Sequence, residues 1–394
     1  MSPEELTAAI DTLIRDHPPT TTDPHDFLGA RFDAGLAWVW VDRSDGGSKA
    51  APALQALVEQ RLTAAGAPHP GAYNPIGIGM CGPTLLAHGT PEQRAKYLRP
   101  LFTGEEVWSQ LFSEPSAGSD VAGLATRARR DGDEWILDGQ KVWTSYAHLA
   151  RRGLILARTD PDLPKHQGIT AFVVDLHAPG VEVRPLRQMT GAAEFNEVFF
   201  DGVRVPDSDR VGDPGAGWRV GTTTLMNERV SLGGALAVRA EPGSDILDGY
   251  RVAASKGEGN PVRRDEAVRL WIEANVNHLT AIRAAAGGNR GKPGPEGSVL
   301  KLTTAEYNRR AAEFQVDLLG AAGALVPGYE VRQPTLPYGS SGIPATTTWF
   351  LRTRANTIEG GTSEILRNIL GERVLGLPGD VRVDKGVAWK DVPR

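Results

Sequence analysis

A carboxylate and a guanidinium stand side by side in an otherwise apolar stretch, "TLMNERVSLGG", residues 224–234. Glu228 and Arg229 interrupt a run of leucine, methionine and valine. One interpretation is a helix that turns a charged face to water. The other is chemical: a carboxylate nearly stripped of water has a raised pKa and becomes a useful base, while the adjacent cation positions a substrate. The elements around the pair have to distinguish the two.

Small residues follow a glutamate in "WSQLFSEPSAGSDVAG", residues 108–123. Glu114 and Pro115 are followed by the small residues Ser116, Ala117, Gly118 and Ser119. Small side chains let a ligand approach the backbone, and N–H groups stabilise anions, so this stretch suits a phosphate. Taken alone, it is equally compatible with a plain turn.

Two further stretches combine glycine, hydroxyls and an aromatic ring. "DGQKVWTSYA" (138–147) is predicted to be a turn followed by Trp143, which is either a core side chain or the cover of a planar cofactor. "ANTIEGGTSEILRNI" (355–369) joins a glycine pair to a helix whose positive end offers the hydroxyls of Thr362 and Ser363. An ordinary capped helix is the alternative for this second stretch.

A Gly-x-Gly-x-x-Gly pattern, "GIGMCG" at 77–82, lacks the strand before it and the helix after it that a dinucleotide site requires. Asn74-Pro75 precedes the pattern and Pro83 comes directly after it, so we predict a structural loop. The whole of 66–83 is rich in glycine and proline and is predicted to be irregular.

The composition narrows the functional classes. The chain has 394 residues, is 40% hydrophobic and 23% charged, and carries a net charge of −5, without the basic excess of a nucleic-acid binder. The single cysteine, Cys81, excludes an internal disulfide and fits a reducing cytoplasm. The histidines show no metal-ligand spacing, and no apolar run approaches the length of about 20 residues that spans a bilayer. We therefore expect a cytoplasmic protein without a metal, a membrane or a nucleic-acid partner.

Residues 1–107 are predicted to form a helical domain. Ser2 caps a first helix, and Thr90 caps another with Gln93 at the capping-box position and Gly104 after its last turn. Length alone allows two or three domains in the chain.

Residues 108–218 change to short β-branched or aromatic runs separated by Gly, Asp and Pro, which predict strands and turns. These runs are "EWILDGQKVWTS", "GLILART", "ITAFVVD", "VEVRPL" and "FNEVFFDGVRVP". The third is almost continuously apolar, as in a strand buried on both faces.

Residues 219–378 return to helical periodicity, and 379–394 are predicted to be an extended tail. One helix is expected to bury a single stripe: Ala267, Leu270, Trp271, Ala274, His278 and Ile282. Two segments, 239–263 and 327–347, are predicted to be longer excursions between helices.

Together these stretches resemble the acyl-CoA dehydrogenase family. The resemblance covers nearly the whole chain and rests on "HGTPEQRAKYLRPLFTG", "SEPSAGSD", "DGQKVWTS", "FNEVFFDGVRVP" and "NTIEGGTSEILRNILGERVLG", in the order and spacing of that family. It implies an α+β multidomain fold with a helical N-terminal domain, a central β-barrel or sandwich domain and a C-terminal four-helix bundle. It also implies non-covalent FAD, oxidation of an acyl-CoA thioester to trans-2-enoyl-CoA, and electron transfer to electron-transfer flavoprotein.

The resemblance assigns roles by position. The FAD contacts that it implies are Gln110, Phe112, Ser113, Gly118, Ser119, Trp143, Ser145, Thr362 and Glu364. Trp143 and Ser145 fall where the family covers the flavin and hydrogen-bonds its N5 side. The acyl-CoA contacts that it implies are Ser119, Arg229, Gly360 and Gly361, the N–H of Gly360 being a donor to the thioester carbonyl.

The base that many family members carry in a Tyr-Glu-Gly-Thr run is missing here, because Gly360 occupies that position. Glu359 is one residue away, and its side chain is expected to point elsewhere. The isovaleryl-CoA and long-chain branches carry the base on an earlier helix, directly before an Arg, and "LMNERVSLGG" is similar to that segment. The resemblance therefore implies that Glu228 takes the alpha proton while the beta hydrogen leaves as hydride to flavin N5.

Two features depart from the family pattern. No Arg-x-x-Phe-Gly segment, which clamps FAD from a neighbouring subunit, lies between the first two C-terminal helices, and Asp317 replaces the glutamine of a second cross-subunit contact. Some actinobacterial-type members form mixed tetramers with a second dehydrogenase chain. Either such an assembly or a homo-oligomer with other FAD contacts is expected.

Other functional classes remain as alternatives. They are a non-catalytic subunit that completes a partner's site, an acyl-carrier-protein-linked dehydrogenase, and a flavin monooxygenase on the same fold. A nucleic-acid-associated member is disfavoured by the acidic charge. An earlier-helix base favours a bulky, branched or ring-bearing acyl group.

Overall fold

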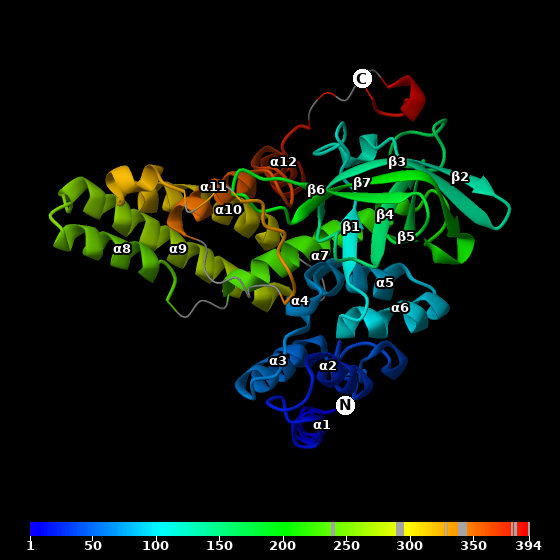
Figure 1. Cartoon of the computed structure of the whole chain (residues 1–394), viewed down its shortest axis with the longest axis horizontal. Helices are drawn as coiled ribbons and strands as arrows, with labels where there is room; N and C mark the ends of the chain where they lie inside the picture. The colour runs from blue at the N-terminus through cyan, green and yellow to red at the C-terminus, as the bar shows by residue number, and fades with distance from the viewer. Residues whose placement is uncertain are drawn as a thin grey trace.

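The computed structural model describes residues 1–237, 241–288, 295–326, 328, 330–337, 345–379, 381 and 384–392, with the side chains of 229–237 and 285–288 outside that description. Figure 1 shows three bodies: N-terminal helices (blue) lie beneath a sheet (cyan to green), and long C-terminal helices (yellow-green to orange) extend to one side. This arrangement confirms the predicted α+β multidomain architecture.

The N-terminal body consists of short helices that begin at the predicted caps. They are α1 (Pro3–Asp16), α2 (Pro24–Asp33), α3 (Gln55–Ala64), α4 (Pro70–Tyr73), α5 (Gly82–His88) and α6 (Pro91–Thr103). Ser2 and Thr90 both form complete capping boxes, and Gly104 adopts the left-handed conformation at the end of α6. These three local predictions are confirmed.

The prediction that 66–83 is irregular is wrong. The segment contains α4 and a π-helical turn at Gly77–Cys81 that runs directly into α5, so "GIGMCG" is not a loop. Packing explains the glycine at position 77, because a side chain there would collide with Asn74. The fully buried Asn74 amide donates to the carbonyls of Leu101 and Glu106 and accepts from the Trp108 N–H, which ties this segment to the first strand.

The central body is an eight-stranded sheet in the order β6-β7-β3-β2-β4-β5-β8, with β1 parallel to β4. Five strands coincide with the predicted runs. The strands are β1 (Trp108–Leu111), β2 (Arg127–Asp131), β3 (Glu134–Ser145), β4 (Arg152–Arg158), β5 (Ile169–Asp175), β6 (Val181–Leu186), β7 (Phe195–Pro206) and β8 (Arg210–Val211). The predicted burial of β5 on both faces is also confirmed.

Strand β4 separates two hydrophobic cores. Leu154 and Leu156 pack with residues of α6 and with Val220, whereas Ile155 and Ala157 face a second core formed by β2, β3, β5 and β7. Alternate side chains of a strand point to opposite faces, so β4 joins the sheet domain to the N-terminal helices on one side and closes the sheet interior on the other.

Residues 138–147 do not form the predicted turn, because Asp138 and Gly139 lie inside the continuous strand β3. The register against β7 shifts between Leu137 and Gly139 and again between Lys141 and Thr144. Such bulges insert extra residues and re-aim side chains. Likewise, β1 ends at Leu111, so Glu114 stands beyond the strand rather than at its end.

The C-terminal body is helical, as predicted. Its helices are α7 (Gly217–Ala237), α8 (Ser244–Ser255), α9 (Pro261–Gly288), α10 (Glu296–Asp317), α11 (Thr346–Thr353) and α12 (Ser363–Ile369). No described helix is both long enough and apolar enough to cross a membrane. Much of the 327–347 segment lies outside the described residues.

Two expectations for this body are wrong. Residues 239–263 contain α8, which buries Ile246 against α9 and begins after a left-handed glycine. The buried stripe of α9 excludes Trp271 and Ile282, which are 39% and 49% exposed, because the helix packs through Ala267, Leu270 and Ala274 instead.

The prediction of an extended tail does not hold for residues 384–392, which lie against the β-domain. The Trp389 N–H donates to the carbonyl of Leu163 at 2.9 Å, and its indole Nε1–H donates to the carbonyl of Gly123 at 3.2 Å. The Arg158 guanidinium stands 4.7 Å from the centre of the Trp389 ring. The end of the chain therefore braces the short 3-10 turn at Val121–Gly123, directly after the "SAGSD" stretch.

Replacing Trp389 by alanine is expected to loosen this turn. A cation–π contact and a hydrogen bond together contribute roughly 1–2 kcal/mol, so amide exchange at Val121–Gly123 should rise about tenfold in hydrogen-exchange mass spectrometry. Lys390→Ala is the matched control, because its 2.5 Å pair with Asp162 is largely exposed and contributes little. Unchanged exchange in Trp389→Ala would contradict the bracing role.

Candidate active site

The end of β1 and the second bulge of β3 are joined by hydrogen bonds. The Ser109 hydroxyl donates to the carbonyl of Ser145 at 2.8 Å, and the Val142 N–H donates to the carbonyl of Ser113 at 2.9 Å. Gln110 lies between them on β1 and is half-buried. The fold thus brings together the predicted flavin residues of the two strands.

Trp143 projects from this bulge. Its backbone adopts φ 58°, a left-handed conformation that an aromatic residue rarely takes, and its side chain is 55% exposed. One edge packs against Phe195, with ring centroids 5.7 Å apart and planes at 78°. A large ring held in a strained backbone and left half uncovered is not a core residue; it offers a flat apolar face for a planar group.

The turn after Glu114 leaves small residues at an open surface. Glu114 and Ala117 exchange backbone hydrogen bonds, and a side chain added to Gly118 would meet nothing within 4 Å. Within the described chain, the N–H groups of Gly118 and Ser119 donate to no acceptor. Nothing in the fold therefore requires a glycine here, and the free amides suit an anionic ligand.

A fully buried ion pair between Lys141 and Glu114 stabilises this turn. The Lys141 ammonium lies 2.8 Å from Oε1 of Glu114 and donates to the carbonyl of Phe112 at 3.0 Å. The N–H groups of Ala125 and Thr126 donate to the same carboxylate. Burial opposes ionisation of Glu114, but Lys141 and the hydrogen bonds outweigh it and hold the pKa of this carboxyl below its ordinary value. Burial also lowers the pKa of Lys141, against the attraction of Glu114.

Glu228 lies on the face of α7 that packs against β4, against Phe112 and against α5. A side chain on Gly221 would come within 3.6 Å of the Phe112 ring, and the Thr224 hydroxyl lies 3.0 Å from that of Thr84. Glu228 follows Thr224 by one helical turn and Gly221 by two, about 10 Å along the axis, so it shares their face. Its side chain is half-buried and takes part in an interaction within the protein.

The glycine pair before α12 forms a left-handed turn, with φ 63° at Gly360 and φ 94° at Gly361. Side chains are disfavoured in this region, so the turn presents bare backbone. The Lys301 ammonium of α10 donates to the carbonyls of Asn356 at 3.0 Å and Gly361 at 2.5 Å. Of the two hydroxyl residues offered by the sequence, Thr362 is the N-cap of α12, and its hydroxyl accepts from the Ile365 N–H.

Glu359 points away from this turn into an ion pair. Both of its carboxylate oxygens accept from Arg352, at 3.0 and 2.9 Å, and Asn356 donates to Oε1 at 2.7 Å. Both oxygens of the Glu359 carboxylate are therefore occupied by side-chain donors of this chain.

The structure does not bring every predicted site residue together. Phe112 is 3% exposed and belongs to the core, which leaves its backbone as the part that a cofactor can contact. Glu364 is 77% exposed beside Arg367. The Arg229 side chain lies outside the described residues, as do residues 289–294, where part of the family's clamp segment was sought.

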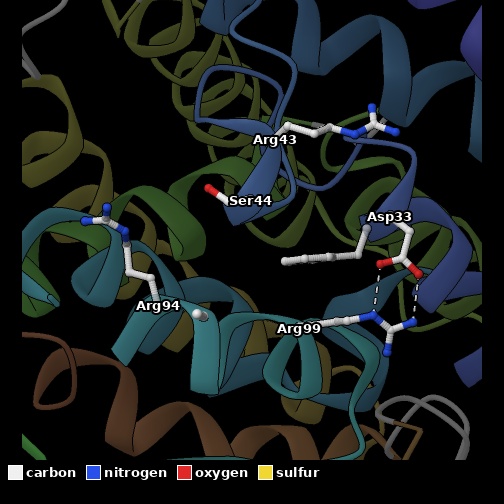
Figure 2. A pocket seen from close by; sticks show the side chains of 7 residues that line it. Asp33, Arg43, Ser44, Arg94 and Arg99 are labelled. Atoms are coloured by element: carbon white, nitrogen blue, oxygen red, sulfur yellow. Dashed lines mark hydrogen bonds and ion pairs between the residues drawn. The ribbon is translucent and has the colours of Figure 1, made fainter. Parts of the chain in front are cut away.

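A pocket of about 370 Å³ lies elsewhere, among the N-terminal helices. It is lined by Phe32, Asp33, Arg43, Ser44, Arg94, Ala95 and Arg99. Figure 2 shows that its arginine side chains diverge and that Arg99 is engaged by Asp33, with Nη2 to Oδ2 at 2.8 Å. This pocket contains no residue that the sequence predicts for catalysis.

Sequence reasoning missed the side chains that support the site: Lys141, Lys301 and Arg352. Each acts on groups distant in the sequence, and Lys301 and Gly361 are 60 positions apart. No local pattern points to Arg352.

Family models for the N-terminal, middle and C-terminal domains of acyl-CoA dehydrogenases match residues 6–105, 109–203 and 215–375. The chain therefore belongs to the acyl-CoA dehydrogenase family, whose members are flavin-dependent oxidoreductases. This confirms the resemblance on which the expected fold and enzyme class rest.

Two relatives that are 39% and 43% identical to this chain are proteins of Mycobacterium tuberculosis. Acyl-CoA dehydrogenase IpdE1 is 39% identical over 350 residues, covering 89% of this chain and 86% of IpdE1. Acyl-CoA dehydrogenase FadE34 is 43% identical over 334 residues, covering 84% of this chain but 43% of FadE34, so the chain spans less than half of that relative. The solved Tcur3481-Tcur3483 steroid ACAD is 26% identical, covers 96% of this chain and 98% of its own, and has a TM-score of 0.71.

Proposed function

We propose that the chain catalyses FAD-dependent α,β-dehydrogenation of an acyl thioester, with Glu228 as the base for the alpha proton. The assignment of the base rests on the glycine turn, where the nearby carboxylate already has partners within the chain. Gly360 has no side chain, and Glu359 is taken up by Arg352 and Asn356. Glu228, two helical turns after Gly221 on α7, is the carboxylate that the family resemblance leaves for this role.

The residues present fit FAD. The half-uncovered ring of Trp143 suits the flavin plane, and the open amides of Gly118 and Ser119 suit the pyrophosphate. When bound, FAD would supply the acceptor for the beta hydrogen as hydride. Ser145, whose carbonyl is fixed by Ser109, would orient the ring system.

The other steps belong to side chains and backbone of this chain. Glu228, whose side chain is half-buried, would take the alpha proton. The Gly360 N–H would donate to the thioester carbonyl, where negative charge grows as the proton leaves. Lys301 holds this turn through the carbonyl of Gly361.

A bulky, ring-bearing acyl group is the substrate class that we favour. Gly360 and Gly361 place no side chain beside the predicted thioester position, which leaves more room than a glutamate at that position would. The similarity to a steroid ACAD agrees with this choice. Electron-transfer flavoprotein is proposed as the electron acceptor.

We also propose that a second dehydrogenase chain completes the FAD site. Asp317, the last residue of α10, stands where the family carries a glutamine that reaches the neighbouring subunit's FAD. The similarity to the Tcur3481-Tcur3483 protein supports an assembly of unlike chains. A homo-oligomer is the competing arrangement.

The flavin content of the chain purified alone tests this arrangement. We expect clearly less than one FAD per chain, even after incubation with FAD, and a content near one per site after co-expression with a dehydrogenase chain that carries an intact Arg-x-x-Phe-Gly segment. The measurement is the visible absorption spectrum with quantification of released flavin. Stoichiometric FAD in the chain alone would refute the need for a partner and favour the homo-oligomer.

A further inference from the structure

A single arginine connects the glycine turn to the β-domain at the flavin side of the site. Arg352 belongs to α11, and its guanidinium grips the Glu359 carboxylate with two hydrogen bonds, at 3.0 and 2.9 Å. Its Nε stands 3.6 Å from Oε1 of Glu194, the residue before β7. Arg352 therefore bridges carboxylates from two bodies of the protein.

The contact continues to Trp143. The Arg352 guanidinium lies 5.9 Å from the centre of the Phe195 ring, and Phe195 meets Trp143 edge to face at 5.7 Å. The carbonyl of Glu194 accepts from the Tyr146 N–H at 2.8 Å, directly after the end of β3. Through Glu194 and Phe195, Arg352 thus reaches both sides of the strained segment that carries Trp143.

At the helical end of this bridge, Glu359 directly precedes Gly360 in the chain. Asn356 also donates to this carboxylate, and Asn308 of α10 donates to the Asn356 side chain at 3.1 Å. The glycine turn is therefore linked to α10 through Asn356 and to the β-domain through Arg352. Glycines tolerate many backbone conformations, so a turn of two glycines needs such external ties to keep one geometry.

We infer that Arg352 is a positioning residue that sets the distance between the Gly360 N–H and the Trp143 face. The inference rests on the proposed function, in which the thioester carbonyl meets Gly360 and the flavin meets Trp143. Without Arg352 the two walls of the site lose their side-chain bridge, and the acyl chain would be held at variable distance from the hydride acceptor. A misplacement of about 1 Å in such a site costs up to about 100-fold in rate.

The test compares Arg352→Gln with Arg354→Gln. Arg354 lies two residues away, has nearly the same exposure, and pairs with Glu313 at 2.6 Å without reaching the β-domain. In the FAD-loaded enzyme, Arg352→Gln is expected to lower the rate of flavin reduction about 10- to 100-fold with FAD content retained, whereas Arg354→Gln stays near the parent. Equal losses in both variants would overturn the inference.

A second readout needs no cofactor. The emission of Trp143 is obtained as the difference between the parent and Trp143→Phe, and its quenching by acrylamide reports how firmly the ring is held. Arg352→Gln should raise this quenching above the parent value, and Arg354→Gln should leave it at the parent value. Unchanged quenching together with an unchanged reduction rate in Arg352→Gln overturns the inference.

The two proposals fail differently. If no acyl thioester reduces the parent enzyme, the proposed function fails, while the quenching of Trp143 still decides whether Arg352 holds it. Arg352→Lys serves if Arg352→Gln does not fold, because it keeps the charge but loses the bidentate grip. The double variant Arg352→Gln/Glu359→Gln should be no slower than the slower single variant; additive losses would show that Arg352 does not act through Glu359.

Discussion

Replacing Glu228 by glutamine is expected to abolish reduction of the bound flavin by an acyl thioester while leaving FAD content and ligand affinity near the parent values. The amide has almost the shape of the carboxylate but cannot accept the alpha proton. Loss of a positioned base costs typically about 10²- to 10⁴-fold in rate. Anaerobic rapid mixing with the thioester, followed in the visible flavin band, measures this loss directly.

Two variants make the result specific to Glu228. Glu273→Gln removes a carboxylate from α9 that pairs with Arg310 outside the site, and it should reduce at the parent rate. Glu359→Gln should be impaired less than Glu228→Gln, since we place Glu359 in a supporting contact with Arg352. Near-normal reduction in Glu228→Gln, with a deep loss in Glu359→Gln, would move the base to the glycine turn.

Replacing Lys141 by methionine is expected to destabilise the β-domain by about 3–5 kcal/mol, because it leaves the Glu114 carboxylate buried without its counter-charge. Side-chain exposure at this pair is 0% for Lys141 and 4% for Glu114, so water cannot replace the lost partner. Chemical denaturation followed by far-UV circular dichroism measures the change. Lys49→Met, which breaks a pair with Asp42 that is 75% and 54% exposed, is the control and should cost at most about 1 kcal/mol.

The same pair predicts a pH dependence. The pKa of Glu114 lies below its ordinary 4.5 in the folded protein, so the stabilisation is present above pH 4.5 and is lost as the pH falls through the lower folded value. Lys141→Met removes the main attraction that lowers this pKa. Its free energy of unfolding should therefore fall less steeply with acid than that of the parent, and equally steep curves would contradict the assignment.

Local chemistry explains what the sequence predicted well. The run "EWILDGQKVWTS" coincides with β3, and the run "ITAFVVD" coincides with β5. β-Branched and aromatic side chains bounded by Gly, Asp and Pro favour strands wherever they occur. The capping boxes at Ser2 and Thr90 are equally local, because each is closed within four residues.

Tertiary packing explains the failures in the helical regions. Gly77 and Gly82 suggested a loop, but a side chain at Gly77 would collide with Asn74, and one at Gly82 would crowd Trp38. Propensity yields to such contacts, and the sequence of 66–83 does not show which of its residues will meet in space. On α9, the choice between Ala267 and Trp271 as the buried face depends on α8 and α10 together, and α8 was not predicted.

The same distinction between local sequence pattern and tertiary packing applies to the residues of the site. Trp143 and the small residues after Glu114 were found because their types suit a flavin and a phosphate. Lys141 lies in phase with the buried Trp135 and Leu137, but alternation does not show which group neutralises its charge, because Glu114 stands 27 residues earlier in the chain. Arg352 was missed because its partners Glu194 and Phe195 are brought to it by the packing of two bodies.

Anaerobic titration of the FAD-loaded enzyme with an acyl-CoA thioester, assembled with a partner chain where the chain alone does not retain FAD, tests the central claim most directly. We predict that the visible flavin band bleaches stoichiometrically, that the product is the trans-2-enoyl thioester, and that Glu228→Gln under the same conditions binds the thioester without bleaching. A flavin that stays oxidised in the parent with straight, branched and ring-bearing thioesters, on CoA and on carrier protein alike, would contradict the account.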